Sequence, residues 1–191
     1  TAALAILNTV VSSAAGLVSW LMVERLATGK PTLVGGCTGL VAGLVVVTPG
    51  AGFVEPWAAV VMGLVVSPVC YLAISHLKAR FGYDDALDAF GCHGVGGILG
   101  GLLTGLFCVP ELSWTGQGGL LYTGDPSLMV SQVLGILVTL VIVVALDLAL
   151  IGVLRLAFRG KLRVSDRDEA LGLDVAEHGE SAYPAFTGLD A

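Results

Sequence analysis

One histidine lies just inside a long apolar stretch of the chain. His93 occurs in the segment from residue 84 to residue 107, DDALDAFGCHGVGGILGGLLTGLF, which is rich in glycine and looks long enough to enter a membrane. An imidazole can accept or donate hydrogen bonds and can carry a proton near neutral pH. Ionisable groups inside a membrane are rare and usually face a bundle interior or a pore. A satisfied core histidine and a pore or proton-relay group therefore both fit His93.

Three aspartates, Asp84, Asp85 and Asp88, precede this histidine. Carboxylates at the start of a helix complement its dipole and accept hydrogen bonds from its free N–H groups, so capping is the first interpretation of all three. Asp88 lies five residues before His93. That spacing does not put the two side chains on one helical face.

The other residues that could do chemistry are scattered. His76 stands in SHLKAR, at a charged helix end, and is interpreted as a solvated interfacial residue. Asp147 lies among valines and leucines, where an interfacial position, a protonated or hydrogen-bonded carboxyl and a transport role all remain open. The cysteines form no CxxC pair and have no histidine at ligand spacing, which favours apolar packing over a metal site or disulfides: Cys37, Cys70, Cys92 and Cys108. With no acid–base pair or nucleophile motif, the sequence predicts no enzyme and no cofactor.

The elements that must position these residues are membrane spans. The chain has 191 residues, of which 55% are hydrophobic and 13% charged, and its charges gather in a few short clusters. Globular domains average about 25% charged residues. Seven of the 15 acidic residues follow Val164, so the net charge of -6 describes a polar tail and does not indicate nucleic-acid binding. An all-α, polytopic membrane protein is predicted.

Apolar runs near the length needed to span a bilayer divide the chain into five spans within a transmembrane bundle over residues 1–160. The spans are expected at about residues 2–26, 32–47, 57–77, 86–107 and 127–158, and residues 161–191 form a polar C-terminal region. The chain starts at Thr1 in apolar sequence, without an initiator methionine or a basic leader, which suggests a piece of something longer with no signal peptide.

Small and polar residues indicate how the spans pack. Glycines at four-residue spacing, Gly35, Gly39 and Gly43, predict close helix contacts. The glycines after His93 have the same spacing and predict packing on more than one side, with little lipid exposure for the histidine. The polar residues of the first span are expected to bond across helices. Pro68, inside the third span, requires a neighbour for the carbonyl that it leaves unbonded.

The nine Lys and Arg residues indicate the orientation. They follow the first, third and fifth spans, and the stretches 49–56 and 108–126 contain none. The positive-inside rule therefore places the ends of those spans and the whole tail in the cytoplasm, with Thr1 outside.

The residues themselves resemble a known family, the ammonium transporters. Asp84, Asp85, Asp88 and the run from Phe90 to Phe107 resemble that family's tenth membrane helix. The tail pattern GLDxxxHGExAY is similar to its cytoplasmic C-terminal region. Earlier spans are similar to the preceding helices, at Asn8-Thr9, Gly43 and Thr48-Pro49 among others. The resemblance covers essentially the whole chain.

The resemblance implies the ammonium transporter fold, in which a full subunit has eleven helices in two inverted repeats plus a last helix, and assembles as a homotrimer in the cell membrane. This chain would supply helices seven to eleven and the tail. It also implies a hydrophobic pore that conducts ammonium or ammonia, with site residues at His93, Asp88 and Phe90. His93 would be the second of two paired pore histidines, and the first is not in this sequence.

A regulatory role for the tail is implied in the same way. In many bacterial members a PII-type signal protein plugs the cytoplasmic pore mouth, near Asp88. The tail residues that match the family motif are Gly172, Asp174, His178, Gly179, Glu180 and Tyr183. Two alternatives to transport are an ammonium sensor or receptor and a Rhesus-type ammonia gas channel, although Rhesus relatives usually lack this tail.

Overall fold

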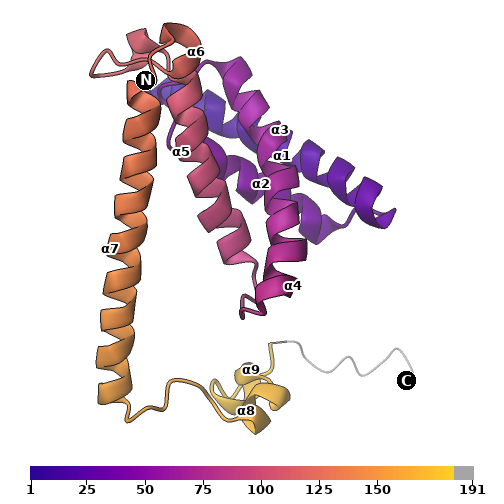
Figure 1. Ribbon diagram of the computed structural model, residues 1–191. Helices are drawn as coiled ribbons and strands as arrows, with labels where there is room; N and C mark the ends of the chain where they lie inside the picture. Colours follow the sequence, from indigo (N-terminus) through magenta and orange to yellow (C-terminus); the bar gives the residue numbers. More distant parts are fainter. Residues whose placement is uncertain (183–191) are drawn as a thin grey trace. The chain divides into compact units, whose positions relative to one another are not determined.

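The computed structural model describes residues 1–182, and within them every regular element is a helix. The chain divides into two compact units, Thr1–Thr139 and Leu140–Ala191. The first unit contains α1 (Ala2–Thr28), α2 (Leu33–Val47), α3 (Pro56–Leu72), η1 (Ala73–Leu77), α4 (Lys78–Phe81), η2 (Phe90–Val95), α5 (Gly96–Phe107), η3 (Pro110–Leu112), α6 (Leu120–Thr123) and the first part of α7 (Ser127–Ala157) (Figure 1). The second contains the rest of α7, α8 (Asp166–Leu171) and α9 (Leu173–Ala176). The predicted all-α class is confirmed.

Four helical stretches of the described chain are long and apolar enough to cross a membrane, judged by length and composition. They are Ala2–Thr28, Pro56–Phe81, Phe90–Phe107 and Ser127–Ala157, and the apolar helix Leu33–Val47 is shorter. The fourth span therefore begins at Phe90, whereas the sequence predicted a start near residue 86. Residues 83–88 form an irregular connection with a turn at residues 86–87, and Asp88 there has a left-handed φ of 55°.

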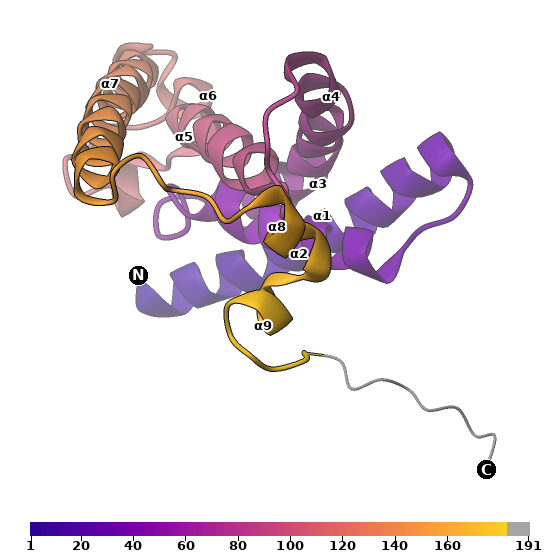
Figure 2. The same ribbon diagram turned by 90° about the horizontal axis from the view of Figure 1, so that it is seen from below.

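The first unit is built on the contact of α1 with α2 and α3, which lie side by side in Figures 1 and 2. Glycine makes the α1–α2 approach possible. A Cβ atom at Gly43 would overlap the carbonyl oxygen of Ser12 and lie 2.8 Å from Ser13 Cα, and one at Gly39 would overlap Trp20. The close contact predicted from glycine spacing is confirmed at these positions. Beside it, Met62, Val46 and Val66 are fully buried in the core.

Most polar side chains of α1 bond to the backbone of neighbouring helices and loops, as predicted, whereas Thr9 Oγ1 donates to Ala5 O of its own helix. The fully buried Asn8 donates from Nδ2 to the carbonyl oxygens of Ala51 and Val54, both at 2.8 Å. Ser12 Oγ donates to Gly43 O at 2.8 Å. Such bonds satisfy backbone carbonyls inside an apolar bundle, while Asn8 Oδ1 has no hydrogen-bond partner among the described residues.

The carbonyl left free by Pro68 also has a partner. Pro68 lies inside α3 and has no N–H to offer Leu64, four residues earlier. Ser19 Oγ of α1 donates to Leu64 O at 2.7 Å and fills the gap. Ser19 of α1 thus supplies the hydrogen bond that Pro68 removes from α3.

Candidate functional site

His93 lies in η2, a π-helical segment at the start of the fourth span. It lines a pocket of about 320 Å³ with Cys92. On the other side of this pocket is α2, which contributes Val34, Cys37, Thr38 and Val41, and the turn before η2 contributes Leu87 and Ala89. The pocket wall is mainly apolar, with an imidazole, a hydroxyl and two thiols as its polar groups. Such a wall disfavours a hydrated ion and leaves the imidazole as the main hydrogen-bonding group.

The imidazole is exposed in this structure, contrary to the expectation that glycine packing would leave it little exposure. The glycines of α5 do pack on two sides: a Cβ at Gly100 would overlap the carbonyl of Val46, and one at Gly105 would lie 3.0 Å from Met129 Cα. Gly97, one turn after His93, has nothing within 4 Å of its Cβ position. The side of the helix that carries His93 and Gly97 is therefore open.

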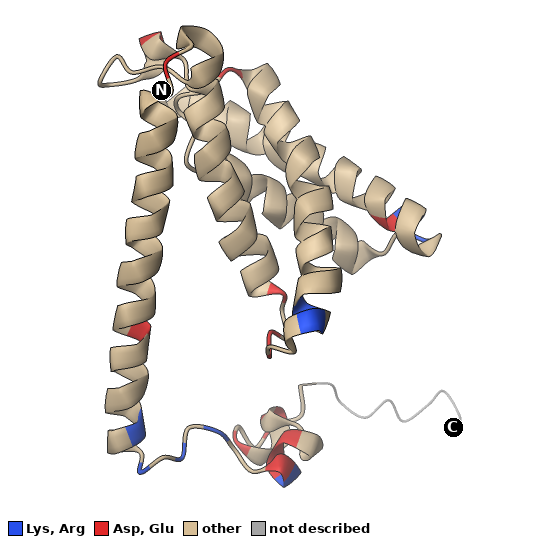
Figure 3. Ribbon diagram, in the orientation of Figure 1, with Lys and Arg blue, Asp and Glu red and all other residues tan. Residues whose placement is uncertain are grey.

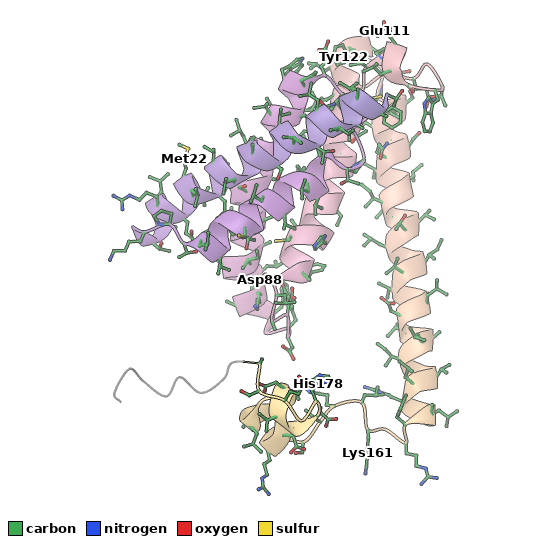
Figure 4. All side chains as sticks on the ribbon, turned by 180° about the vertical axis from the view of Figure 1, so that it is seen from behind. Met22, Asp88, Glu111, Tyr122, Lys161 and His178 are labelled. Atoms are coloured by element: carbon green, nitrogen blue, oxygen red, sulfur yellow. The ribbon has the colours of Figure 1, made fainter. Side chains whose placement is uncertain are left out.

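Asp88 and Phe90 do not join His93 in this pocket. Asp88 Oδ1 forms an ion pair with Lys78 Nζ at 2.7 Å. Figure 4 labels Asp88 at the tip of the first unit. The Phe90 ring packs edge-on against Tyr83, with centroids 5.6 Å apart, and lines a different pocket of about 460 Å³. Of the three predicted pore residues, the structure places only His93 in the α2 pocket.

The turn before η2 is held by Asp85, whose capping role the sequence predicted, and by Lys78, whose part it did not reveal. Asp85 Oδ1 and Oδ2 accept hydrogen bonds from the amides of Ala89 and Phe90, each at 2.9 Å. The predicted capping role is therefore confirmed for Asp85. Lys78 was interpreted only as an orientation signal, because its partner Asp88 is ten residues away across a turn and no local spacing marks the pair.

The two ends of the first unit differ in charge. Figure 3 shows Lys and Arg at α4 and at the end of α1, and none in the part that holds α6. At that second end, Glu55 Oε2 accepts hydrogen bonds from Trp57 Nε1 at 2.6 Å and Tyr122 OH at 2.8 Å, and these bonds lower the pKa of Glu55. Tyr122 and Glu111 are labelled there in Figure 4, opposite Asp88.

The described tail residues form a compact turn in the second unit. Asp174 O accepts from Glu180 N at 3.0 Å, and its Oδ2 accepts from Ala182 N at 2.9 Å. The bond from Ala182 is the main cause that lowers the pKa of Asp174. Five of the six predicted tail residues lie in or beside this turn: Gly172, Asp174, His178, Gly179 and Glu180. Tyr183 is outside the described residues.

The remaining candidates form no further site. Asp147 lies on α7, and no residue of this helix is buried in the structure. Within residues 1–182, no group of three or more His, Cys, Asp or Glu side chains could hold a metal ion. His76 is exposed in η1, and the cysteines in this part of the chain are free thiols.

Comparison with known proteins links the whole arrangement to one family. The model of the Ammonium Transporter Family matches residues 1–183. The ammonium transporter of Bacillus subtilis strain 168 is 44% identical over 179 residues, which are 94% of this chain and 44% of that protein. A putative ammonium transporter of Methanothermobacter thermautotrophicus is 55% identical over 121 residues, 63% of this chain and 30% of its own length.

Solved structures agree with these sequences. The chain resembles Saccharomyces cerevisiae Mep2 with a TM-score of 0.78 and 35% identity, over 97% of this chain and 42% of that one. A structure described as a sensor Amt protein has a TM-score of 0.78 and 29% identity, over 92% of this chain and 42% of its own. The chain thus spans less than half the length of these relatives.

Proposed function

Because the chain belongs to the ammonium transporter family, we propose that it forms part of a pore that moves ammonium or ammonia across a cell membrane, with His93 in the path. The observation that carries this proposal is the imidazole of His93 beside a mainly apolar pocket, on the open side of a membrane-length helix. The fold is that of the family's multi-pass membrane proteins. We propose ammonium or ammonia as the transported species, and a path for it that passes His93.

The physical basis of the mechanism is desolvation. An ammonium ion that loses its water in a narrow apolar passage is destabilised relative to ammonia, and this favours loss of a proton. A neutral imidazole accepts hydrogen bonds from the nitrogen and can relay the proton. Sodium and potassium ions cannot give up a proton and are excluded by the same apolar wall.

A complete pore requires groups beyond this chain. We place a second pore histidine, contributed by the other half of a full subunit, opposite the open side of His93. Three such subunits form the homotrimer, each with its own pore. Asp88 and Phe90 then border the path at one end and do not share the histidine pocket.

We assign the tail a regulatory role at the cytoplasmic face. The clustering of Lys and Arg at the end of α1, in α4, and at and beyond the end of α7 supports a cytoplasmic C-terminus. The turn around Asp174 provides an ordered surface in the tail. A PII-type signal protein is the partner that we propose for it.

The test is a His93→Ala substitution in the complete protein. We expect ammonium-driven current in proteoliposomes to fall strongly, or selectivity against potassium to be lost, because the imidazole is the main polar group of the pocket. Thr38→Ala, in the same pocket, removes a hydroxyl without touching the imidazole and is the matched control. Unchanged current and selectivity in His93→Ala would refute the assignment.

Ammonium sensing without useful flux is the second candidate function. It is favoured by one observation, the similarity to the sensor Amt structure. A flux assay on the complete protein separates the two, since a sensor binds ammonium at saturable sites but passes no current.

A further inference from the structure

Two π-helical segments meet beside His93. η1 lies near the end of the third span, before α4, and η2 begins the fourth. A Cβ atom at Gly91 of η2 would overlap the side chain of Ile74 in η1. π-Helical turns are rare and frequently occur at functional sites. Here they bring the backbone of η2 directly onto η1, so the position of His93 depends on this contact.

Lys78 connects the two segments. Its backbone N–H donates to Ala73 O and closes η1. Its side-chain Nζ donates to Asp85 O at 2.6 Å and pairs with Asp88 Oδ1 at 2.7 Å. A single residue thus ends one π-helical segment and holds the turn that precedes the other.

Both aspartates are in turn attached to the first residues of η2. The carboxylate of Asp85 accepts from the amides of Ala89 and Phe90. The carbonyl of Asp88, a residue with a left-handed φ of 55°, accepts from the amide of Cys92 at 3.0 Å. Cys92 directly precedes His93. A chain of hydrogen bonds therefore runs from the ammonium of Lys78 to the backbone beside the imidazole.

We propose that Lys78 is a positioning residue for His93: through Asp85 and Asp88 it holds η2 in the π-helical form that turns the imidazole toward the α2 pocket. The transport consequence rests on the proposed function, whereas the geometric part does not. Relaxation of η2 by one residue to an α-helix would rotate its side chains by about 100°. That rotation would carry His93 away from the pocket and bring the buried Cys92 out.

The exposure of the Cys92 thiol would change with this rotation, so its rate of chemical labelling measures the rotation. Cys92 is 4% exposed in the structure, whereas Cys70, on α3, is fully buried and should stay so. The experiment compares the rate at which N-ethylmaleimide labels Cys92 in the complete wild-type protein and in Lys78→Met, by mass spectrometry of the Cys92 peptide, with Cys70 as internal reference. We expect about tenfold faster labelling of Cys92 in Lys78→Met, because the variant loses the charge-assisted hydrogen bonds that hold η2.

Two further variants define the specificity of the effect. Arg80→Met removes an exposed positive charge two residues away and should leave Cys92 protected. Lys78→Arg keeps the charge and should restore protection. Because Lys78→Met could fail to fold, Asp88→Asn is made in parallel, since it weakens the same pair from the other side and should also speed labelling.

Transport kinetics give the functional readout. In Lys78→Met we expect a several-fold lower maximal flux of methylammonium with little change in KM for uptake, because the imidazole is moved while the end of the unit opposite Asp88, which holds α6, is not. Equal labelling of Cys92 in wild type, Lys78→Met and Asp88→Asn would overturn the proposal. Faster labelling supports it even if His93→Ala transports normally, a result that would refute only the proposed function.

Discussion

At the scale of single residues, side chains far apart in sequence satisfy one another. Asn8 holds the loop carbonyls of Ala51 and Val54, and Ser19 serves the carbonyl that Pro68 leaves free. At the end with α6, Glu55 is held by Trp57 and by Tyr122, 67 residues later in the chain. The bonds of Asn8 fix the loop between α2 and α3, and the bond of Ser19 joins α1 to α3.

Glu55 gives a prediction about pH. Its hydrogen bonds from Trp57 and Tyr122 lower its pKa below the ordinary 4.5. A carboxyl whose folded pKa is depressed adds stability above its unfolded pKa, and that stability is lost as pH falls through the lower folded value. We therefore expect the stability difference between wild type and Tyr122→Phe to be present near neutral pH and to shrink below 4.5. Thermal unfolding in detergent at a series of pH values measures it.

The control for this pH prediction is a tyrosine in a different contact. Tyr83, whose ring packs on Phe90, lies in the turn before η2 and has no contact with Glu55. Tyr83→Phe removes a hydroxyl there and should leave the acid dependence as in wild type. A wild-type to Tyr122→Phe difference that is constant from neutral to acid pH would contradict the role of Glu55.

At the scale of helices, glycine decides which faces meet. Gly43 lets the backbones of α1 and α2 touch, and Gly100 and Gly105 do the same for α5 against α2 and against the start of α7. Gly97 has open space instead, on the side of His93. The same residue type at the same spacing therefore marks both a packed face and an open one.

Gly43→Ala tests the packed face. The new methyl group would meet backbone atoms of Ser12 and Ser13, which cannot move aside as a flexible side chain can. We expect a loss of about 1–3 kcal/mol, the usual range for overpacking, read as a lower unfolding temperature. Gly152→Ala on α7, where nothing lies within 4 Å, is the control and should cause no loss of stability, since alanine is the better helix former. Equal stability of the two variants would show that α1 and α2 are not packed as the structure has them.

At the scale of the whole molecule, the described chain is two units, one with the packed helices and one with the end of α7 and the tail. The family comparison covers residues of both. The tail turn depends on its own hydrogen bonds, above all those of Asp174. Regulation by the tail can therefore be tested by opening this turn without removing it.

Asp174→Ala is the variant for that test. It removes the acceptor of the Ala182 amide, so the turn should open, and we expect weaker co-purification of the proposed PII-type partner with the complete protein. Glu177→Ala removes an exposed acidic residue of the same segment and is the matched control. If Asp174→Ala binds the signal protein and transports as wild type does, the turn is not the regulatory surface.

The sequence by itself determined the all-α membrane class, the family and the residues worth testing, because apolar run length, charge clustering and the glycine–histidine motif are local properties of the chain. The bonds of Asn8, Ser12 and Ser19 to other segments also followed, since an unpaired polar group in a bundle is unfavourable, but the bond of Thr9 within its own helix did not. Which carbonyl each residue serves did not follow. That Ser19 meets Leu64 depends on how two helices are set against each other.

Only the tertiary structure decided how His93 is presented. The sequence predicted a helix from about residue 86 with little exposure of the histidine. The structure has an irregular connection up to Asp88, a π-helical η2 and an exposed imidazole. It also separated Asp88 and Phe90 from the histidine pocket and joined Asp88 to Lys78. The physical reason is that helix start, π-helical form and ion pairing across a turn depend on contacts between η1 and η2, and no periodicity along one segment encodes these contacts.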